Sequence, residues 1–487
     1  MTVAIALRDL LDGMVDHGRL PELEICGLSL NSRQLQRGEG FVALAGRQGH
    51  GMDYLDQAVA AGAAVVLHDG RAEVPADCPL PAIEVARLNE CLDRLAKRVW
   101  GDPGSEMDLI AVTGTNGKSS VSWLLAQALD GAMIGTLGMG RPGAHRKGDM
   151  TTPDVLTLYR ELAGLREAGL NTVVMEASSH ALDQGRLAGL VFSSTIFTTL
   201  GHDHLDYHVD RQAYGAAKAR LFFDFASRRQ LINLDDAFGQ ELADRLGESP
   251  GLVGYSLADH QGARIRAEAI SSGVEGLSAE LVVDERRLTV RSKLLGRVNL
   301  WNLMIVAGEM AARDIPDADI IATLDRLEPV PGRMQPIRDG EGRLAVIDYA
   351  HTPDALNHAL ESLRALTPGE LWCVFGCGGD RDRAKRPRMG RVAESLADHV
   401  VLTDDNPRHE DGMSIIRAIQ AGMHRPHRCL VIRDRAEAIT RAINDSMAGD
   451  VVLIAGKGHE AEQVVGDERR PFDDVASARE ALEALPC

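Results

Sequence analysis

The 487-residue sequence is short of positive charge, and it lacks long apolar runs. Its 53 Lys and Arg stand against 71 Asp and Glu, which gives a formal net charge of −18. This sign argues against a nucleic acid or an anionic membrane as a partner, because phosphate binding needs positive charge. No apolar run reaches the ~18 residues of a membrane-spanning helix. Residues 1–20 mix Arg and Asp among their apolar positions, unlike a signal peptide. We therefore expect a cytoplasmic protein.

Closely paired cysteines are also missing. The seven cysteines form no CxxC pair and have no zinc-ligand spacing. Cys373 and Cys377 lie in an apolar stretch and the turn after it, where buried thiols are more common than a redox pair. The cysteine pattern thus predicts a reduced protein.

What is present is the composition of a globular enzyme with several cores. Hydrophobic residues make up 45% of the chain and charged residues 25%, which is ordinary for a soluble enzyme. A chain of 487 residues exceeds what one core usually holds. Residues 100–106 have the composition of a linker, and residues 329–332 are rich in proline and glycine. We therefore expect three domains, covering residues 1–97, 98–328 and 329–487.

The order of apolar segments predicts an α/β fold. In the central segment, apolar strands alternate with helical patterns, as at 172–175 and 230–233, which is typical of a mostly parallel sheet. A period of two over 266–295 predicts an antiparallel insert. Further strands at 344–347 and 451–454 predict an open α/β unit of the Rossmann type in the third domain. The first domain is expected to be a small α/β domain, and the central one to be of the P-loop type.

The most informative segment is a glycine-rich turn between a predicted strand and a predicted helix. The apolar run 109–113 leads into Gly114-Thr115-Asn116-Gly117-Lys118-Ser119-Ser120. Such a turn directs backbone N–H groups and a helix N-terminus at one point, which suits a polyphosphate. Lys118 would neutralise the β- and γ-phosphates, and the Ser119 hydroxyl would ligate Mg²⁺. A standard P-loop has a glycine where this chain has Val112, so the short form excludes most kinases and GTPases. We predict ATP as the nucleotide.

More polar residues stand at predicted strand ends of the central segment. Glu176 follows the strand 172–175, where it could complete Mg²⁺ coordination or serve as a helix N-terminal acid. Residues 201–208 contain three histidines and two aspartates, which is typical of a metal or phosphate site. Lys218, taken alone, is an ordinary helix lysine. Asn299 and Asn302 are three residues apart on one helix face, where their amides can read a nucleobase edge.

The third segment gathers opposite charges at neighbouring strand ends. Five cations fall within the eight positions 381–388, a pattern that is costly in an acidic protein unless the cations face an anion. Asp405 and Arg408 follow a strand at 400–402, and Glu460 follows the strand at 451–455. Arginine can grip a carboxylate with two hydrogen bonds while an acid takes an ammonium group. The segment therefore predicts a zwitterionic ligand.

In this order, and over essentially the whole chain, these motifs resemble those of the Mur ligases, ATP-dependent amide-forming enzymes of peptidoglycan precursor assembly. The matching segments are 114–120, 175–180, 203–208, 214–222, 296–302, 348–354, 379–387, 405–408 and 456–460. Within the family, DNPR at 405–408 together with GKGHE at 456–460 is similar to the members that add meso-diaminopimelate. Lysine-adding members lack the DNPR arginine, so Arg408 carries the substrate prediction.

The resemblance implies a role for each matching residue. The implied ATP contacts are Gly114, Thr115, Asn116, Gly117, Lys118, Ser119, Ser120, Asn299, Asn302, Arg333, Asp348 and His351. The implied metal ligands are Ser119, Glu176, His204 and Lys218 as a carbamate (N6-carboxylysine). The implied UDP-muramoyl-dipeptide contacts are Leu30, Ser32, Arg47, Gln48, Gly49, Thr151, Thr152, Ser178, Gln184 and Arg186. The implied diaminopimelate contacts are Arg381, Asp405, Asn406, Pro407, Arg408, Gly456 and Glu460. Lys118, Lys218 and His204 are the implied catalytic residues.

The implied reaction joins meso-diaminopimelate to UDP-N-acetylmuramoyl-L-alanyl-D-glutamate through an acyl phosphate, with ATP and Mg²⁺, in a monomer. Met150 and Thr199 stand where some relatives have asparagine, and we expect neither to touch the ATP or amino-acid motifs. One alternative is a folylpolyglutamate-type ligase, which shares the short P-loop but does not explain the first domain or the motifs at 405–408 and 456–460. The other is a nucleotide-gated binding or scaffold protein that hydrolyses ATP without ligation.

Overall fold

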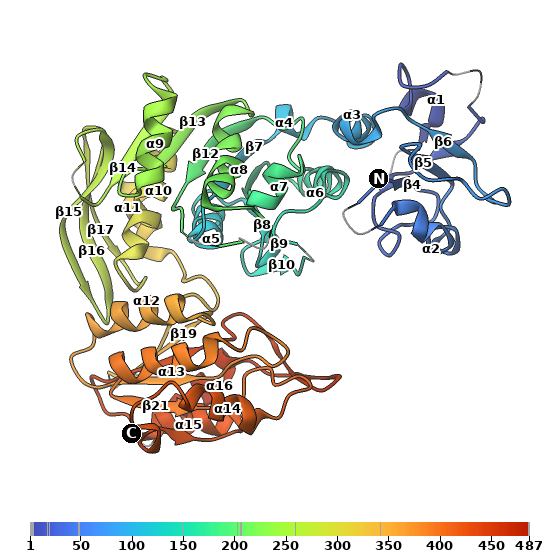
Figure 1. Cartoon of the computed structure of the whole chain (residues 1–487). Helices are drawn as coiled ribbons and strands as arrows, with labels where there is room; N and C mark the ends of the chain where they lie inside the picture. The colour runs from blue at the N-terminus through green and yellow to red at the C-terminus, as the bar shows by residue number, and fades with distance from the viewer. Residues whose placement is uncertain are drawn as a thin grey trace. The chain divides into compact units, whose positions relative to one another are not determined.

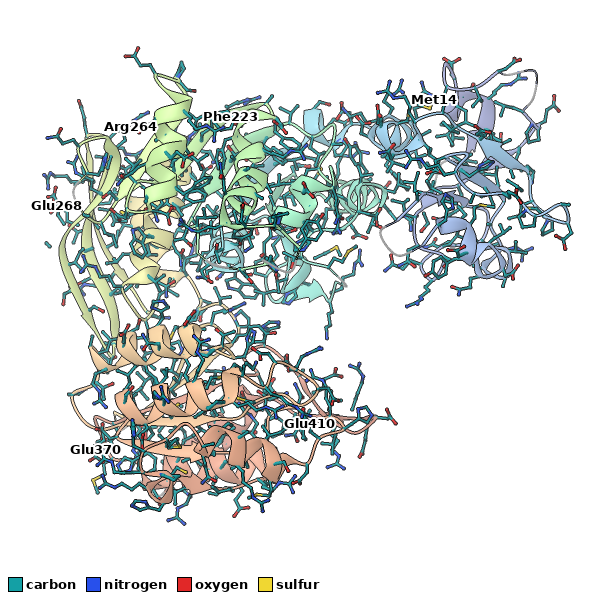
Figure 2. The ribbon with its side chains drawn as sticks, in the orientation of Figure 1. Met14, Phe223, Arg264, Glu268, Glu370 and Glu410 are labelled. Carbon is teal, nitrogen blue, oxygen red and sulfur yellow. The ribbon has the colours of Figure 1, made fainter. Side chains whose placement is uncertain are left out.

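The computed structural model describes residues 4–16, 18, 20–46, 49–148, 150–201, 203–204, 207–258, 260–340 and 342–485. The chain divides into two compact units, residues 1–253 and 254–487. Figure 1 labels many of the elements of each unit, and Figure 2 adds side chains. Among the described residues, no helix is both long enough and apolar enough to cross a membrane.

The first unit begins with a small four-stranded parallel sheet. Its strands, in spatial order, are β3 (Leu28–Ser29), β4 (Gly40–Ala43), β5 (Val65–His68) and β6 (Ala82–Glu84). The same segment of the chain contains a short antiparallel pair, β1 (Ile5–Ala6) and β2 (Glu24–Ile25), and the helices α1 (Leu7–Leu10), α2 (Leu55–Ala61) and α3 (Leu92–Trp100). Phe41, Val66 and Leu55 lie in a compact core. This arrangement confirms the small α/β fold expected for the N-terminal segment.

The second sheet of this unit carries the glycine-rich turn. Its strands run in the order β10 (Ala144–Arg146), β9 (Gly138–Arg141), β8 (Ala132–Gly135), β11 (Thr172–Glu176), β7 (Asp108–Thr113), β12 (Phe192–Phe197) and β13 (Ser227–Asn233). All pairs from β8 to β13 are parallel, and the pairs made by β9 and β10 are antiparallel. The strand β7 lies between β11 and β12, so the carboxyl ends of these three strands meet at one edge.

Helices connect the parallel strands, as the alternating pattern predicts. They are α5 (Lys118–Ala128), α6 (Val155–Glu167), α7 (Ser179–Asp183), α8 (Arg211–Phe223) and α9 (Ala237–Leu246). Asp154, Ser178, Asp210 and Asp236 each accept hydrogen bonds from the first turn of the helix that follows them, so polar caps fix where four of these helices begin. The predicted linker at 100–106 is not all loop, because its residues Pro103–Glu106 form the short helix α4. This helix begins with a proline, a residue that is favoured at the first position of a helix.

The second unit opens with an antiparallel meander. The division between the units falls inside strand β14 (Leu252–Ser256), whose last three residues pair in parallel with β15 (Ala263–Gly273). The strands β15, β16 (Gly276–Val283) and β17 (Arg286–Ser292) are antiparallel neighbours, which confirms the insert predicted at 266–295. Helices α10 (Val298–Ala311) and α11 (Asp317–Arg326) pack against these strands.

The C-terminal sheet is the expected open α/β unit. Its strands run in the order β18 (Gln335–Arg338), β19 (Leu344–Asp348), β23 (Val451–Ala455), β20 (Leu371–Phe375), β21 (His399–Leu402) and β22 (Leu430–Val431). Only the β18–β19 pair is antiparallel among these described strands. The helices are α12 (Pro353–Arg364), α13 (Lys385–Leu396), α14 (Gly412–Gln420), α15 (Arg435–Asp445) and α16 (Asp474–Glu483), and a hairpin joins β24 (Glu462–Val465) to β25 (Glu468–Pro471).

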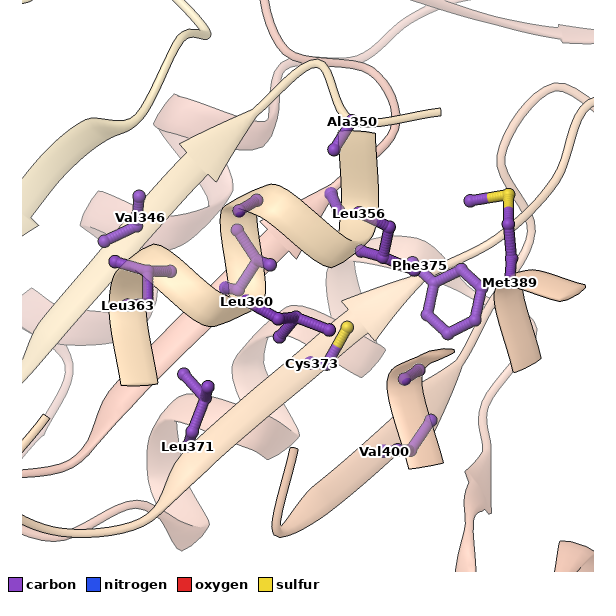
Figure 3. Close-up of a cluster of buried hydrophobic side chains, with 14 of the residues drawn as sticks. Val346, Ala350, Leu356, Leu360, Leu363, Leu371, Cys373, Phe375, Met389 and Val400 are labelled. Atoms are coloured by element: carbon purple, nitrogen blue, oxygen red, sulfur yellow. The ribbon is translucent and has the colours of Figure 1, made fainter. Parts of the chain in front are cut away.

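Both faces of this sheet are buried, which explains its continuous apolar strands. In β20, Cys373 and Phe375 point into one core, part of which Figure 3 shows, and Trp372 and Val374 point into the other. Cys373 and Cys377 are buried free thiols, as the sequence predicts, and burial raises the pKa of Cys377 to about 12.

One fully buried ion pair joins the last helices. Arg435 at the start of α15 donates from Nε and Nη2 to the two carboxylate oxygens of Asp474, at 2.7 and 2.8 Å. Both side chains are inaccessible to solvent. Arg435 also donates to the carbonyl of Ala455 at the end of β23, so the pair ties α15, α16 and the sheet together.

Candidate active site

The glycine-rich turn adopts a conformation that its sequence makes possible. Gly114 has φ of 148°, and a Cβ at this position would overlap the Thr198 side chain. Only glycine avoids both the strain and the overlap. The helix α5 then begins at Lys118, so Ser119 and Ser120 lie in its first turn. The structure therefore brings all seven predicted residues of the turn together at the carboxyl end of β7.

Two lysines converge on this turn. Lys118 Nζ donates to the carbonyls of Gly114 and Thr115, at 2.8 and 2.9 Å. Lys218 reaches the same Gly114 carbonyl from α8, at 2.8 Å. Lys218 is 1% exposed, so it is not an ordinary surface lysine of a helix. Burial, and then the charge of Lys118, lower the pKa of Lys218 well below its usual value, which favours a neutral amine there.

Glu176 is the last residue of β11 and does not follow the strand as predicted. Its buried carboxylate accepts hydrogen bonds from the backbone N–H of Thr136, at 2.8 Å, and from the Thr136 hydroxyl, at 3.3 Å. The next helix begins only at Ser179, with Ser178 as its cap. Glu176 is therefore no helix N-terminal acid, and the alternative of a ligand-binding carboxylate at the strand end remains.

The histidine-rich segment forms a ring cluster. His204, a half-exposed residue with a left-handed φ of 54°, lies edge-on to His180, with 4.8 Å between the ring centroids. His208 is buried, and its Nε2 lies 3.0 Å from the Ser179 hydroxyl. His202 and Asp206 lie outside the described residues. Within the described ranges, no three His, Cys, Asp or Glu side chains are grouped so that they could hold a metal ion.

The predicted peptide-binding residues come together beside Glu176. The Thr152 hydroxyl donates to the carbonyl of Glu176 at 2.6 Å and lies 3.2 Å from the Ser178 hydroxyl. Arg186 donates to the carbonyl of Thr152 at 2.7 Å and to Gln184 Oε1 at 2.6 Å. Burial lowers the pKa of Arg186, although an arginine remains charged.

Neighbours complete this arrangement. The Thr151 hydroxyl lies 3.0 Å from that of Thr136, the residue that also holds Glu176. Met150, which departs from some relatives, accepts a hydrogen bond from Arg186 through its sulfur. The methionine thus contacts the same arginine as Thr152 does. Thr199, the other departure, does touch the ATP motif, contrary to the prediction: its carbonyl accepts the backbone N–H of Thr115 at 2.7 Å, and its hydroxyl accepts that of Asn116 at 3.4 Å.

The predicted UDP contacts lie at the carboxyl ends of two neighbouring strands. Leu30 and Ser32 follow β3, and Gly49 follows β4, which is paired with β3 in parallel. The Ser32 hydroxyl donates to Gln57 Oε1 at 3.1 Å. The other two predicted contacts, Arg47 and Gln48, lie outside the described residues.

In the second unit, part of the predicted nucleotide set surrounds Tyr349. Asp348 ends β19 and accepts a hydrogen bond from the backbone N–H of Met334, at 2.8 Å. Burial raises the pKa of Asp348, and it outweighs the lowering by this hydrogen bond and by the charge of Arg333. Arg333 lies over the Tyr349 ring, 4.8 Å from its centroid, and the His351 ring lies 4.5 Å from the same ring.

Asn299 and Asn302 form a separate pair on α10. The Asn302 amide donates to Asn299 Oδ1 at 2.7 Å, which confirms the shared helix face, and Asn299 donates to the carbonyl of Leu295. The pair is buried, and these hydrogen bonds fix the orientation of its amides.

The predicted diaminopimelate contacts converge in the C-terminal sheet. A Cβ on Gly378 would lie 2.9 Å from Arg408 Nη1 and 3.7 Å from Arg381 Cγ, so the two arginines flank this glycine. The Asn406 amide donates to Glu460 Oε2 at 2.8 Å.

The remaining members of this set lie alongside. A Cβ on Gly456 would collide with Asp405, and Pro407 stands between Asn406 and Arg408 in the turn. Lys457, which is fully buried, donates to Asn406 Oδ1 and Glu460 Oε2 and so joins the two turns. Sequence reasoning missed this lysine, although it lies inside the GKGHE motif.

The cation cluster at 381–388 is only partly directed at a ligand, contrary to the prediction. Arg383 and Arg386 pair with Glu410, at 3.1 and 2.8 Å, and lower the pKa of that carboxyl to about 2. Lys385 donates to the carbonyl of His351, and Arg388 lies 3.8 Å from Asp354. Within the described part of the chain, Arg381 and Lys385 are the two members of the five without an acidic partner. The anion that two of these cations face is the protein's own glutamate.

Comparison with known proteins agrees with this arrangement. Three family models match the chain: "Mur ligase family, catalytic domain" over residues 24–100, "Mur ligase middle domain" over 112–310, and "Mur ligase, glutamate ligase domain" over 332–458. A curated protein of Xanthomonas campestris pv. campestris (strain 8004) is 47% identical over 99% of this chain and 98% of its own length. The chain belongs to the Mur ligase family.

Other Mur ligases carry the same name as the Xanthomonas protein, UDP-N-acetylmuramoyl-L-alanyl-D-glutamate–2,6-diaminopimelate ligase. A protein of Ectopseudomonas mendocina (strain ymp) with this name is 46% identical over 94% of this chain and 95% of its own length. A solved structure of such a ligase matches with a TM-score of 0.71 at 34% identity, covering 99% of both chains.

Proposed function

We propose that this Mur ligase joins an amine of meso-diaminopimelate to the D-glutamyl carboxylate of UDP-N-acetylmuramoyl-L-alanyl-D-glutamate, driven by ATP. The product is a precursor of peptidoglycan. The observation that carries the amino-acid substrate is the cluster of two arginines around Gly378 beside the Asn406–Glu460 pair. Diaminopimelate has two carboxylates and two ammonium groups, and such a cluster offers both signs of charge to it.

The phosphate end of ATP would lie in the turn 114–120. Transfer of the γ-phosphoryl group to the glutamyl carboxylate gives an acyl phosphate, and the amine then attacks its carbonyl carbon and expels phosphate. Such a transfer needs alignment of the reacting atoms and neutralisation of charge more than covalent help. Lys118 is the cation of the turn, and binding of the phosphates would replace its present bonds to the Gly114 and Thr115 carbonyls.

Oxygen ligands suit Mg²⁺, and the turn lies near several of them. We assign Ser119, Glu176 and His204 to metal binding, with a carbamate on Lys218 as a further oxygen donor. The support for the carbamate is the buried Lys218 with its lowered pKa, since carbamate formation requires the neutral amine. When bound, Mg²⁺ would offset the charge of the phosphates.

The remaining residues are assigned to three parts of the substrates: the peptide end and the UDP end of the muramoyl substrate, and the nucleoside of ATP. Thr151, Thr152, Ser178, Gln184 and Arg186 would hold the peptide, and the segment around Leu30, Ser32 and residues 47–49 would hold UDP. Asn299, Asn302, Arg333, Asp348 and His351 would contact the nucleoside. We propose domain limits of 1–97, 98–328 and 329–487, and a monomer that acts in the cytoplasm.

The test is phosphate release measured with each substrate left out in turn. Ligation requires ATP, the muramoyl-dipeptide and diaminopimelate together, and mass spectrometry should find the muramoyl-tripeptide. Release without either acceptor would indicate a nucleotide-gated switch instead. Activity with a folate and glutamate would indicate the folylpolyglutamate alternative.

A further inference from the structure

An arginine of the central domain is bonded directly to the small N-terminal sheet. Arg160, in the middle of α6, donates from Nη2 to the carbonyl of Leu28 in β3, at 2.7 Å, and to Glu39 Oε1, at 2.8 Å. Its guanidinium also lies 5.4 Å from the centroid of the Trp100 ring, at the end of α3. This one side chain therefore contacts β3, the residue directly before β4 and the end of α3, all of which precede it in the chain by 60 residues or more.

The carboxylate of Glu39 is buried, and Arg160 balances its charge. Glu39 is 3% exposed in its side chain, and its second oxygen accepts the backbone N–H of Gln36 at 2.9 Å. Among the described residues, Arg160 is the cation within ion-pair distance of Glu39. Removing the cation from a buried ion pair strongly destabilises the fold, because the carboxylate is left as an uncompensated buried charge. The ion pair therefore holds α6 to the N-terminal sheet, and breaking it would leave a charged group buried without its partner.

The two elements that Arg160 joins, β3 and α6, each lie next to one end of the proposed substrate site. On one side, β3 runs into Leu30 and Ser32, which we assign to UDP. On the other side, the cap of α6, Asp154, comes two residues after Thr152, which we assign to the peptide together with Thr151. Arg160 lies six residues beyond that cap, which is ~9 Å along a helix.

We propose that Arg160 and Glu39 are positioning residues that fix the spacing between the UDP end and the peptide end of the muramoyl substrate. This inference rests on the proposed function. A ligand that spans two sites binds more tightly than either half because the second contact is intramolecular, and the gain depends on how well the spacing is held. Removing the ion pair of Arg160 and Glu39 should therefore weaken binding of the whole muramoyl substrate. Binding of the UDP part alone and of the peptide part alone should stay unchanged.

The experiment compares Arg160→Met and Glu39→Gln with the wild-type enzyme and with Glu161→Gln. Arg160→Met keeps an apolar stem beside Trp100. Glu161 is the next residue on α6, and its ion pair with Arg146 does not involve the N-terminal sheet, so it is the matched control. KM and kcat are measured with the full UDP-muramoyl-dipeptide and with the muramoyl-dipeptide lacking UDP. Binding of UDP alone is measured by calorimetry.

We expect KM for the full substrate to rise about 10- to 100-fold in both variants, which is a partial loss of the roughly 100- to 10,000-fold that linkage of two sites can provide. Values for the UDP-free substrate, for UDP alone and for ATP should stay within about twofold of wild type, as should every value for Glu161→Gln. Activity on the UDP-free substrate also shows that the variants are folded. The double variant should be no worse than either single one, since both remove the same contact.

Three outcomes would overturn the inference. An unchanged KM for the full substrate would show that the ion pair does not set the spacing. Weaker binding of UDP alone would show that these residues contact or shape the UDP site itself. An equal loss with the UDP-free substrate would point to a general structural role. A wild-type enzyme without ligase activity would instead refute the proposed function, so the two failures are distinguishable.

Discussion

Truncating Arg408 should separate recognition of diaminopimelate from every other step. Lysine and diaminopimelate share a chain length, but diaminopimelate has one more carboxylate, so its site needs one more cation. In the described part of the protein Arg408 has no acidic partner, and its Nη1 bonds only to the carbonyl of Gly379, at 2.7 Å. The guanidinium is therefore available for a carboxylate, together with Arg381, which lies beside the same glycine, Gly378.

The size of the effect follows from this geometry. Truncating one partner of a buried, hydrogen-bonded charge pair costs about 2–5 kcal/mol, or about 30- to 4000-fold in affinity. The backbone of Arg408 has a left-handed φ of 49°, and alanine retains a Cβ, so Arg408→Ala leaves the strain of that conformation essentially unchanged. The internal bond to Gly379 contributes only about 1 kcal/mol. Most of the loss should therefore appear as a higher KM for diaminopimelate.

The assay is steady-state phosphate release with diaminopimelate and with lysine, for wild type, Arg408→Ala and Arg383→Ala. Arg383 is a nearby exposed cation already paired with Glu410, so its loss should change KM for diaminopimelate little. KM values for ATP and for the muramoyl-dipeptide should move little in either variant. Wild-type preference for lysine, or unchanged diaminopimelate kinetics in Arg408→Ala, would refute this assignment of the substrate.

Three further substitutions test other parts of the molecule. Lys118→Ala should abolish ligation with only a modest fall in the thermal midpoint, because its two hydrogen bonds to backbone carbonyls contribute about 1 kcal/mol each; near-normal turnover of folded protein would exclude the phosphate role. Lys218→Ala should be nearly inactive and partly rescued by added short carboxylic acids, whereas wild-type activity would exclude a carbamate there. Asp474→Asn leaves Arg435 buried without its counterion, so urea unfolding of the second unit should show a loss of about 3–5 kcal/mol; a loss below about 1 kcal/mol would show that the pair is solvated.

The strand-end residues could be located from the sequence because parallel strands end at a common edge. Gly114 directly follows β7 and Glu176 ends β11; both strands are recognisable by their apolar runs, and the structure pairs them side by side. Asp348 and Asp405 could be located in the same way in the C-terminal sheet. Local periodicity was sufficient at these positions, since it fixes both the element and its end.

Features that depend on tertiary packing could not be predicted. The helix around Lys218 has no pattern that distinguishes a buried lysine from a surface one, and its burial arises from packing of α8 against α7 and the turn. The cations Arg383 and Arg386 looked free for a ligand because Glu410, their partner, is more than 20 residues away in the sequence. Arg160 gave no signal at all, because its partner Glu39 lies 121 residues away.

The buried pair of Arg435 and Asp474 has a consequence for how this chain can change over generations. Replacing either residue alone leaves a charge inside the protein, so each single step passes through an unstable molecule. Two apolar residues of similar volume could replace the pair together at little cost, but no one-step path leads there. We therefore expect homologous chains to have either both charges or neither, with intermediates absent from living lineages.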